Sequence, residues 1–163
     1  KLGHQAHYHL SNLIAPEEFL TIADHYAEVV PMQVITEFDV LTNGDDQLAA
    51  DFTRDMMTAA FSHPAFDGFV FWGFWEGKAH HGDGMPWRKD WSARPCGQML
   101  EELLGKTWRT RVEIPVSEQG RVSFRGFYGR YTVDYTTAGK TLHGEVELTP
   151  ATRELNLVLL PRL

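Results

Sequence analysis

A ten-residue stretch at positions 31–40, PMQVITEFDV, decides the fold that this sequence predicts. Its composition is typical of a short buried β-strand with two carboxylates near its C-terminal end. Because strand side chains alternate between two faces, we expect Glu37 and Asp39 to share a face with Ile35. The other face should hold Val34, Thr36, Phe38 and Val40. Acids beside an apolar residue are costly to bury unless they are paired or hydrogen-bonded, so a function for them is indicated.

Strands and helices alternate on both sides of this stretch. The apolar spacing predicts strands over 3–8 and 68–75, helices over 15–30, 48–62 and 96–104, and a polar loop over 76–95. The strand at 68–75 is almost continuously apolar, so we expect it to be covered on both faces. The alternation favours an α/β protein with a parallel sheet, with a repeat of roughly 30–35 residues as in (β/α)8 barrels. Three such units cannot close a barrel.

The pattern changes after residue 107, which divides the chain into an α/β part at 1–107 and a small β-strand extension at 108–163. Short alternating segments punctuated by glycine and proline are typical of antiparallel strands. The expected strands are 111–116, 122–127, 130–135, 142–148 and 155–160. Five aromatic residues are expected to form the core of this extension: Phe124, Phe127, Tyr128, Tyr131 and Tyr135.

The composition restricts the possible partners. The 163 residues carry a formal net charge of -7, which argues against nucleic acid or an anionic membrane as the main partner and is compatible with a neutral substrate. An aromatic content of 12% suits both core packing and stacking on sugars. Cys96 is the single cysteine, so no intrachain disulfide is possible. The chain does not begin with methionine, and we expect it to be processed or part of something longer.

Polar side chains gather near the ends of the three expected parallel strands. Gln5 and His7 share a face of the first strand, while Glu37 and Asp39 stand near the end of the second. In a (β/α)8 barrel the active site lies at the carboxyl ends of the strands. Adjacent strands could therefore bring His7 beside both acids, where an imidazole can hydrogen-bond the two carboxylates.

A metal site is the alternative for the histidine-rich segments. The candidates are His4, His7, His9, His80 and His81. His7 and His9 share a strand face, but neither a cysteine cluster nor a His-Glu-x-x-His motif accompanies them. We therefore predict neither a metal nor a cofactor.

Three segments resemble the sixth, seventh and eighth strands of glycoside hydrolase family 10, the endo-1,4-β-xylanases. They are GHQAH at 3–7, ITEFD at 35–39 and FWG at 71–73, in the same order and at suitable spacing. The loop at 72–94 and the segment RGFYGRY at 125–131 resemble a branch of that family in which a small β extension follows the barrel. The resemblance implies the C-terminal portion of a (β/α)8 TIM barrel, strands 6–8, followed by a small antiparallel β unit.

The resemblance also implies roles for individual residues. Glu37 matches the catalytic nucleophile of a retaining hydrolase, supported by His7 and Asp39. Gln5, Trp72 and Glu76 match substrate-binding positions of the family. Many relatives have aspartate at the position of Glu76. His80 falls near a position often held by an aromatic residue that covers the sugar, so Trp75 or Trp87 is expected to take that role.

One catalytic group of the family is missing from this sequence. The family's general acid/base is the glutamate of an Asn-Glu pair on the fourth strand, and no such pair occurs here. We therefore expect a partner in the form of a missing N-terminal barrel half or a self-associating chain, and a fragment that is inactive alone. The alternative is a non-catalytic carbohydrate-binding or structural remnant stabilised by oligomerisation. The resemblance implies a xylan-like polysaccharide as substrate and an extracellular or periplasmic location.

Overall fold

The structure is a computed structural model that describes residues 1–81, 84–152 and 154–161. The chain divides into two compact units, Lys1–Gly105 and Lys106–Leu163. This division lies two residues before the one at 107/108 that the change in sequence pattern suggests. No helix among the described residues has the length and apolar character needed to cross a bilayer.

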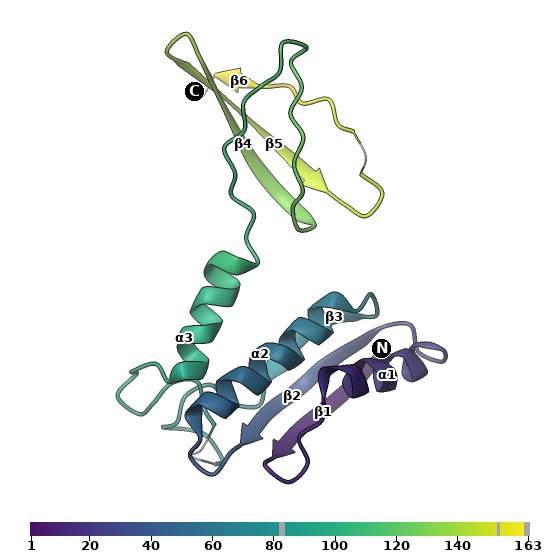
Figure 1. Ribbon diagram of the computed structural model, residues 1–163, viewed down its shortest axis with the longest axis vertical. Coiled ribbons are helices and arrows are strands. Elements are labelled where there is room, and N and C mark those ends of the chain that lie inside the picture. The colour runs from purple at the N-terminus through teal and green to yellow at the C-terminus, as the bar shows by residue number, and fades with distance from the viewer. Residues whose placement is uncertain (82–83, 153, 162–163) are drawn as a thin grey trace. The chain divides into compact units, whose positions relative to one another are not determined.

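The first unit is a three-stranded parallel sheet in the order β1-β2-β3 with helices packed on it (Figure 1). Its elements are β1 (Leu2–His9), α1 (Pro16–Ala27), β2 (Gln33–Leu41), α2 (Asp46–Ser62), β3 (Phe66–Phe71) and α3 (Pro95–Glu102). The π-helical segment η1 (Leu103–Thr107) crosses the division between the two units. Pro16 and Pro95 stand at helix starts, where a missing backbone N–H costs nothing. The Asp45 carboxylate caps α2 by accepting from the Leu48 N–H at 3.0 Å.

The core lies between the sheet and helices α1 and α2. Phe38 on β2 is 1% exposed and contacts Phe52 of α2 and Phe69 of β3, with ring centroids 6.3 and 4.9 Å away. Ten buried residues form the cluster: Ala6, Phe19, Ile35, Phe38, Val40, Ala49, Phe52, Met56, Ala59 and Ala60. The helix-facing side of the sheet is therefore apolar.

The prediction that Ile35 shares a strand face with Glu37 and Asp39 is wrong. Ile35 belongs to the core cluster with Phe38 and Val40 and does not share a face with Glu37. The cause is a bulge, because Ile35 pairs with His4 while Glu37 pairs with the next residue of β1, Gln5. The extra residue shifts the alternation by one position, so the two halves of β2 have opposite phases. A strict period of two cannot predict this shift.

The prediction that both faces of the strand at 68–75 are covered is also wrong. β3 ends at Phe71, and Val70 and Trp72 are 52% and 51% exposed. Phe69 and Phe71 pack on the core, so only the helix side of this strand is covered. The continuous apolar run therefore indicates a second face that the described residues of this chain leave open.

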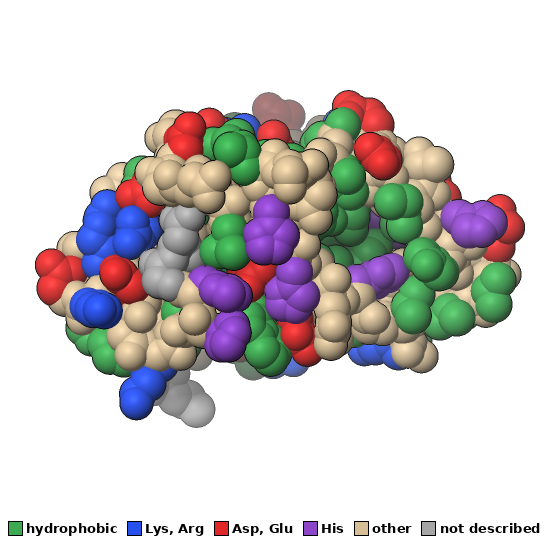
Figure 2. All heavy atoms as spheres, turned by 90° about the horizontal axis from the view of Figure 1, so that it is seen from below, with side chains coloured by type: hydrophobic (Ala, Val, Ile, Leu, Met, Phe, Trp, Pro, Cys, Tyr) green, Lys and Arg blue, Asp and Glu red, His purple; other side chains and the backbone are tan. Residues whose placement is uncertain are grey.

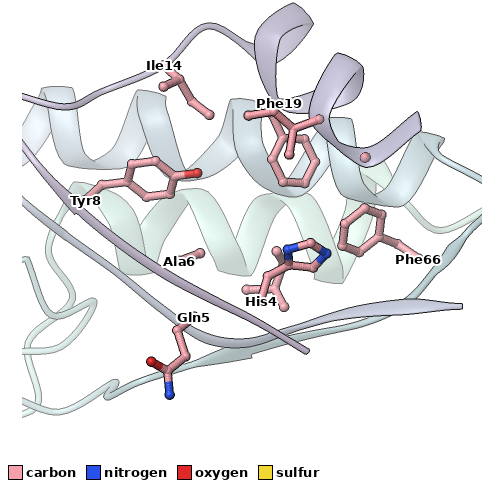
Figure 3. A pocket seen from close by; sticks show the side chains of 10 residues that line it. His4, Gln5, Ala6, Tyr8, Ile14, Phe19 and Phe66 are labelled. Atoms are coloured by element: carbon pink, nitrogen blue, oxygen red, sulfur yellow. The ribbon is translucent and has the colours of Figure 1, made fainter. Parts of the chain in front are cut away.

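A shallow apolar hollow of about 100 Å³ lies beside the outer strand β1. Figure 3 shows Tyr8, Ile14 and Phe19 around it, whereas Gln5 points to the opposite side of the strand. This arrangement separates an apolar, helix-covered side of β1 from a polar side that carries Gln5.

The second unit contains fewer strands than the sequence pattern predicts. Its described strands are β4 (Gly129–Thr137), β5 (Lys140–Leu148) and β6 (Leu160–Pro161), which pair antiparallel. The segments 111–116 and 122–127 do not form strands, and the segment expected at 155–160 contributes only its last residue. The described buried side chains all lie at or before Leu103, so the five aromatics do not make the expected core. Alternation favours extended backbone, but a strand also needs a paired neighbour.

Candidate functional site

The bulge in β2 places the two acids on the open side of the sheet. Thr36 is the inserted residue, and its hydroxyl donates to the His4 carbonyl oxygen at 3.0 Å. After this residue, Glu37 pairs with Gln5, and Asp39 pairs with His7. All four side chains then lie on the face opposite the core. Bulges commonly re-aim a side chain next to an active site.

His7 bridges the two acids. Its Nδ1 lies 2.9 Å from Asp39 Oδ1, and its Nε2 lies 3.1 Å from Glu37 Oε2. The other oxygen of Glu37 accepts from the Gln5 amide, with Nε2 3.1 Å from Oε1. Both carboxylate oxygens of Glu37 are therefore held, which sets the orientation of the carboxylate plane. The contact expected between the imidazole and both acids is present.

The two acids differ in their surroundings. The Asp39 side chain is 7% exposed, while that of Glu37 is 22% exposed. Asp39 is therefore enclosed and serves as a fixed anion behind the imidazole. Glu37 retains access to an incoming molecule, which a reacting group requires.

The site favours the protonated form of His7. The pKa of His7 is raised, chiefly by the hydrogen bond to Asp39, and burial opposes this effect without cancelling it. The Coulombic attraction of Asp39 and the hydrogen bond to Glu37 act in the same direction as the main cause. Because a neutral imidazole has one N–H and both ring nitrogens face carboxylates, only the imidazolium can donate to both.

An open pocket of about 260 Å³ lies beside the bridged acids. It is lined by His7, His9, Asp39, Leu41, Trp72, His80 and His81. Trp72 stands edge-on to His7, with ring centroids 5.8 Å apart and planes at 87°. Figure 2 shows histidine side chains gathered beside acidic ones on this side of the molecule. The pocket combines apolar ring surface with charged groups, as sites for small polar ligands do.

Three of the expected substrate-binding residues lie in the loop after β3 and are absent from the described lining of this pocket. Glu76 forms an ion pair with Arg94, Oε2 to Nη2 at 3.2 Å. The Trp75 ring stacks on Trp91, and the Trp87 ring lies edge-on to Phe74. The structure thus places Gln5, His7, Glu37, Asp39 and Trp72 together and puts Trp75, Glu76 and Trp87 in a separate arrangement.

Sequence reasoning missed Trp91 and did not place His9, His80 or His81 beside the acids. His9 could have been found by strand parity, because it lies two residues beyond His7. The two loop histidines reach the pocket through the course of the loop, which no local pattern encodes. Among residues 1–81, 84–152 and 154–161, no group of three or more His, Cys, Asp or Glu side chains is arranged to hold a metal ion.

Two arginines attach the loop to the start of α2. Arg94 Nη1 lies 2.8 Å from Asp46 Oδ1, and Arg88 Nη2 lies 3.1 Å from Asp46 Oδ2. The Arg94 side chain is 17% exposed and also bonds Glu76, so it joins three segments of the first unit. This network holds the loop that carries the tryptophans.

Replacing Arg94 with alanine is expected to lower the free energy of unfolding by about 2 kcal/mol, because Asp46 and Glu76 lose a half-buried charged donor. The measurement is urea unfolding followed by tryptophan fluorescence. Arg54→Ala is the matched control, since Arg54 is about half exposed and its ion pairs among the described residues are with the solvent-accessible Asp51 and Asp55. We expect a loss below about 1 kcal/mol there. Equal losses in the two variants contradict a special role for the Arg94 network.

Comparisons with known proteins support the resemblance. No family model matches the chain. The anti-sigma-I factor RsgI6 of Acetivibrio thermocellus is 37% identical over 107 residues, which is 65% of this chain and 14% of that protein. Endo-1,4-beta-xylanase 2 of Arabidopsis thaliana is 30% identical over 103 residues, 63% of this chain and 10% of that protein. Endo-1,4-beta-xylanase 1 of the same plant is 28% identical over 106 residues, 65% of this chain and 11% of its own length.

Solved xylanases share a fold with part of this chain. Xylanase 10B of Thermotoga petrophila RKU-1, solved with xylobiose, aligns with a TM-score of 0.56 at 20% identity over 64% of this chain and 36% of that one. Xylanase 10B of Thermotoga maritima aligns with a TM-score of 0.55 at 21% identity over the same shares. The chain is therefore similar to part of an α/β glycoside hydrolase. The particular resemblance to family 10 xylanases is confirmed, and the chain spans about a third or less of the relatives that it matches.

Proposed function

We propose that the first unit is the nucleophile-bearing C-terminal part of a retaining xylanase-like glycoside hydrolase, and that β1, β2 and β3 are strands 6–8 of its (β/α)8 barrel. The parallel order β1-β2-β3, the helices on one face and the acids near the carboxyl end of β2 support this assignment. The observation that carries it is the His7 bridge between Glu37 and Asp39.

In this proposal Glu37 is the nucleophile. One of its carboxylate oxygens attacks the anomeric carbon of the sugar, and the bond from that carbon to the leaving oxygen breaks. The leaving oxygen takes a proton from a second carboxyl group. Water then attacks the same carbon, returns a proton to that second group and releases Glu37. His7 and Gln5 orient the nucleophile, and Asp39 keeps His7 protonated.

The second carboxyl group is supplied by residues outside this sequence. Retaining hydrolysis needs it about 5–5.5 Å from the nucleophile. The open side of the sheet and the unpaired outer edge of β1 are where further barrel strands would pack. The apolar hollow beside β1 supports the same position for the preceding part of the chain, because an apolar surface favours burial.

A first prediction concerns the 163 residues alone. The purified fragment is expected to show no hydrolysis of xylan above the uncatalysed rate, because it lacks the general acid/base. The measurement is the release of reducing sugar at high protein concentration, with the complete polypeptide as the active control. Turnover by the fragment contradicts the proposal that the acid/base lies elsewhere.

The nucleophile assignment is tested by trapping. A 2-fluoro xylobioside with a good leaving group should label the complete polypeptide once, at Glu37. The fluorine slows both formation and breakdown of the glycosyl-enzyme intermediate, while the good leaving group restores its formation, so the intermediate accumulates. Peptide mass spectrometry locates the label. A label on another residue, or none in a preparation that hydrolyses xylan, removes Glu37 from this role.

A non-catalytic carbohydrate-binding module is the second candidate. The observation that favours it is the 37% identical relative, which is named as an anti-sigma-I factor rather than as a hydrolase. The two candidates differ in one measurement on the complete polypeptide. Xylan binding with turnover supports the hydrolase, whereas xylan binding without turnover supports the module.

The proposed substrate also decides the proposed location. Xylan is a polymer too large to cross a membrane, so a protein that acts on it is placed outside the cytoplasm, in the periplasm or beyond the cell. Fractionation of the source cells followed by immunoblotting tests this assignment, and recovery in the cytosol alone contradicts it.

A further inference from the structure

The loop after β3 carries an exposed aromatic group that the proposed catalytic residues do not use. The indole rings of Trp75 and Trp91 are stacked, with centroids 4.9 Å apart and planes at 10°. Phe74 lies 6.2 Å from Trp91 and 6.4 Å from Trp87. Trp91 and Phe74 are 58% and 56% exposed on the first unit. We call Phe74, Trp75 and Trp91 the aromatic platform.

The backbone at Trp91 is held in an unusual conformation. Its φ is 66°, in the left-handed region that bulky residues rarely adopt. The turn is closed by hydrogen bonds from the Trp91 N–H to the Arg88 carbonyl and from the Arg88 N–H to the Ser92 carbonyl, both 2.9 Å. Asp90 accepts from the Ser92 N–H and hydroxyl. Glycine or asparagine would suit this backbone conformation better than tryptophan does.

The platform is rigid before any ligand arrives. The Trp75 Nε1–H donates to the Lys89 carbonyl oxygen at 3.2 Å, and this hydrogen bond sets the plane of the Trp75 indole. Stacking on that plane sets the orientation of the Trp91 ring, while one face of Trp91 stays turned away from Trp75. Preorganised rings lose little conformational entropy on binding. Exposed polar residues stand beside the rings in sequence: Lys78, Lys89 and Asp90.

We propose that the aromatic platform is a carbohydrate-binding site that stacks the apolar face of a pyranose ring in a β-1,4-linked polysaccharide. This inference rests on the proposed function for the class of sugar. A β-1,4-linked xylopyranose ring has all of its substituents equatorial, so its two faces expose C–H groups that suit a flat exposed indole. Two exposed rings flanked by polar side chains match one or two sugar units, whereas a stable protein interface buries about 800 Å² on each partner. The platform residues are absent from the described lining of the pocket at His7, so the site supplies contacts additional to the catalytic ones.

The test uses the complete polypeptide carrying Glu37→Gln, so that binding is measured without turnover. Its affinity for insoluble β-1,4-xylan is compared with that of the same protein carrying Trp91→Gly in addition. Glycine suits the positive φ, so the turn is retained while the indole is removed. We expect the dissociation constant to rise about tenfold. Phe61→Ala is the control, because it removes another exposed aromatic ring from the same unit, and we expect a change below about twofold.

The outcomes separate this inference from the proposed function. Unchanged xylan binding by the Trp91→Gly protein overturns the platform as a sugar site, even where the Glu37-containing protein hydrolyses xylan. An equal loss in the Phe61→Ala protein also overturns it, because the effect is then not specific to the platform. A loss of xylan affinity in the Trp91→Gly protein but not in the Phe61→Ala protein supports the platform as a sugar site. This holds equally for a polypeptide that binds xylan without hydrolysing it.

Discussion

Replacement of Glu37 with glutamine in the complete polypeptide is expected to lower kcat for xylan hydrolysis by at least about 10⁴-fold. The amide has nearly the same shape but lacks the anionic oxygen that attacks the anomeric carbon, so no glycosyl-enzyme intermediate forms. The contacts of Glu37 with Gln5 and His7 lie on the open side of the sheet, away from the core. The fold should therefore survive the change.

The measurement is initial-rate kinetics together with thermal unfolding of both proteins. Glu28→Gln is the matched control, because it makes the same chemical change at an exposed position at the end of α1. We expect that control to keep its activity within about twofold. A loss below about tenfold in the Glu37→Gln protein, with its fold intact, contradicts the role of Glu37 as nucleophile.

Replacement of His7 with glutamine is expected to reduce kcat by about 10²-fold or more, because Glu37 loses a charged donor that orients it. The amide keeps one donor group but cannot carry the positive charge. His7 acts through Glu37, so it is a positioning residue. Its contribution is therefore expected to depend on its protonation.

The pH dependence follows from the raised pKa of His7. A group whose pKa is higher in the folded state stabilises that state fully below its unfolded pKa, about 6.5 for histidine. The stabilisation is lost as pH rises through the raised pKa. The difference in Tm between wild type and the His7→Gln protein should therefore be largest near pH 5.5 and smaller near pH 8.5. The same titration should give wild-type kcat a decline at alkaline pH that the His7→Gln protein lacks.

Thermal unfolding and kcat–pH profiles of both proteins check this expectation. His25→Gln is the control, because His25 is exposed on α1 and contacts only the edge of Tyr26 among the ring pairs that the structure describes. We expect the His25→Gln protein to keep its kcat within about twofold of wild type. A His7→Gln protein with the same pH profile as wild type shows that the imidazole does not couple to Glu37.

The helices and the parallel strands could be predicted from local patterns. Apolar residues at helical spacing mark α2, and its expected end at Ser62 agrees with the structure. The second unit shows where such patterns are insufficient. The segments 111–116 and 122–127 alternate as strands do, but no ladder forms along them, because pairing depends on a neighbour rather than on the segment itself.

The candidate site could be predicted in part. The two-residue alternation of strand side chains predicts that Gln5 and His7 share a face. The adjacency of neighbouring strand ends predicts the contacts of His7 with Glu37 and Asp39, and the structure contains both contacts. Parity failed at Ile35, where the bulge at Thr36 reverses the phase of the strand. Trp75 and Glu76 follow Trp72 closely in the sequence, yet the loop turns them toward Trp91 and Arg94.

The amino-acid sequence alone predicts the order of elements in the first unit, the resemblance to family 10 xylanases and the set of acids and imidazoles available for chemistry. These depend on local spacing and on side-chain type, which are written along the chain. The position of Glu37 on the open side of the sheet and the stacking of Trp91 on Trp75 become visible only in the folded chain. Both depend on where one segment meets another, since the strand register and the course of the loop are set by pairing and by ion pairs between residues far apart in the sequence.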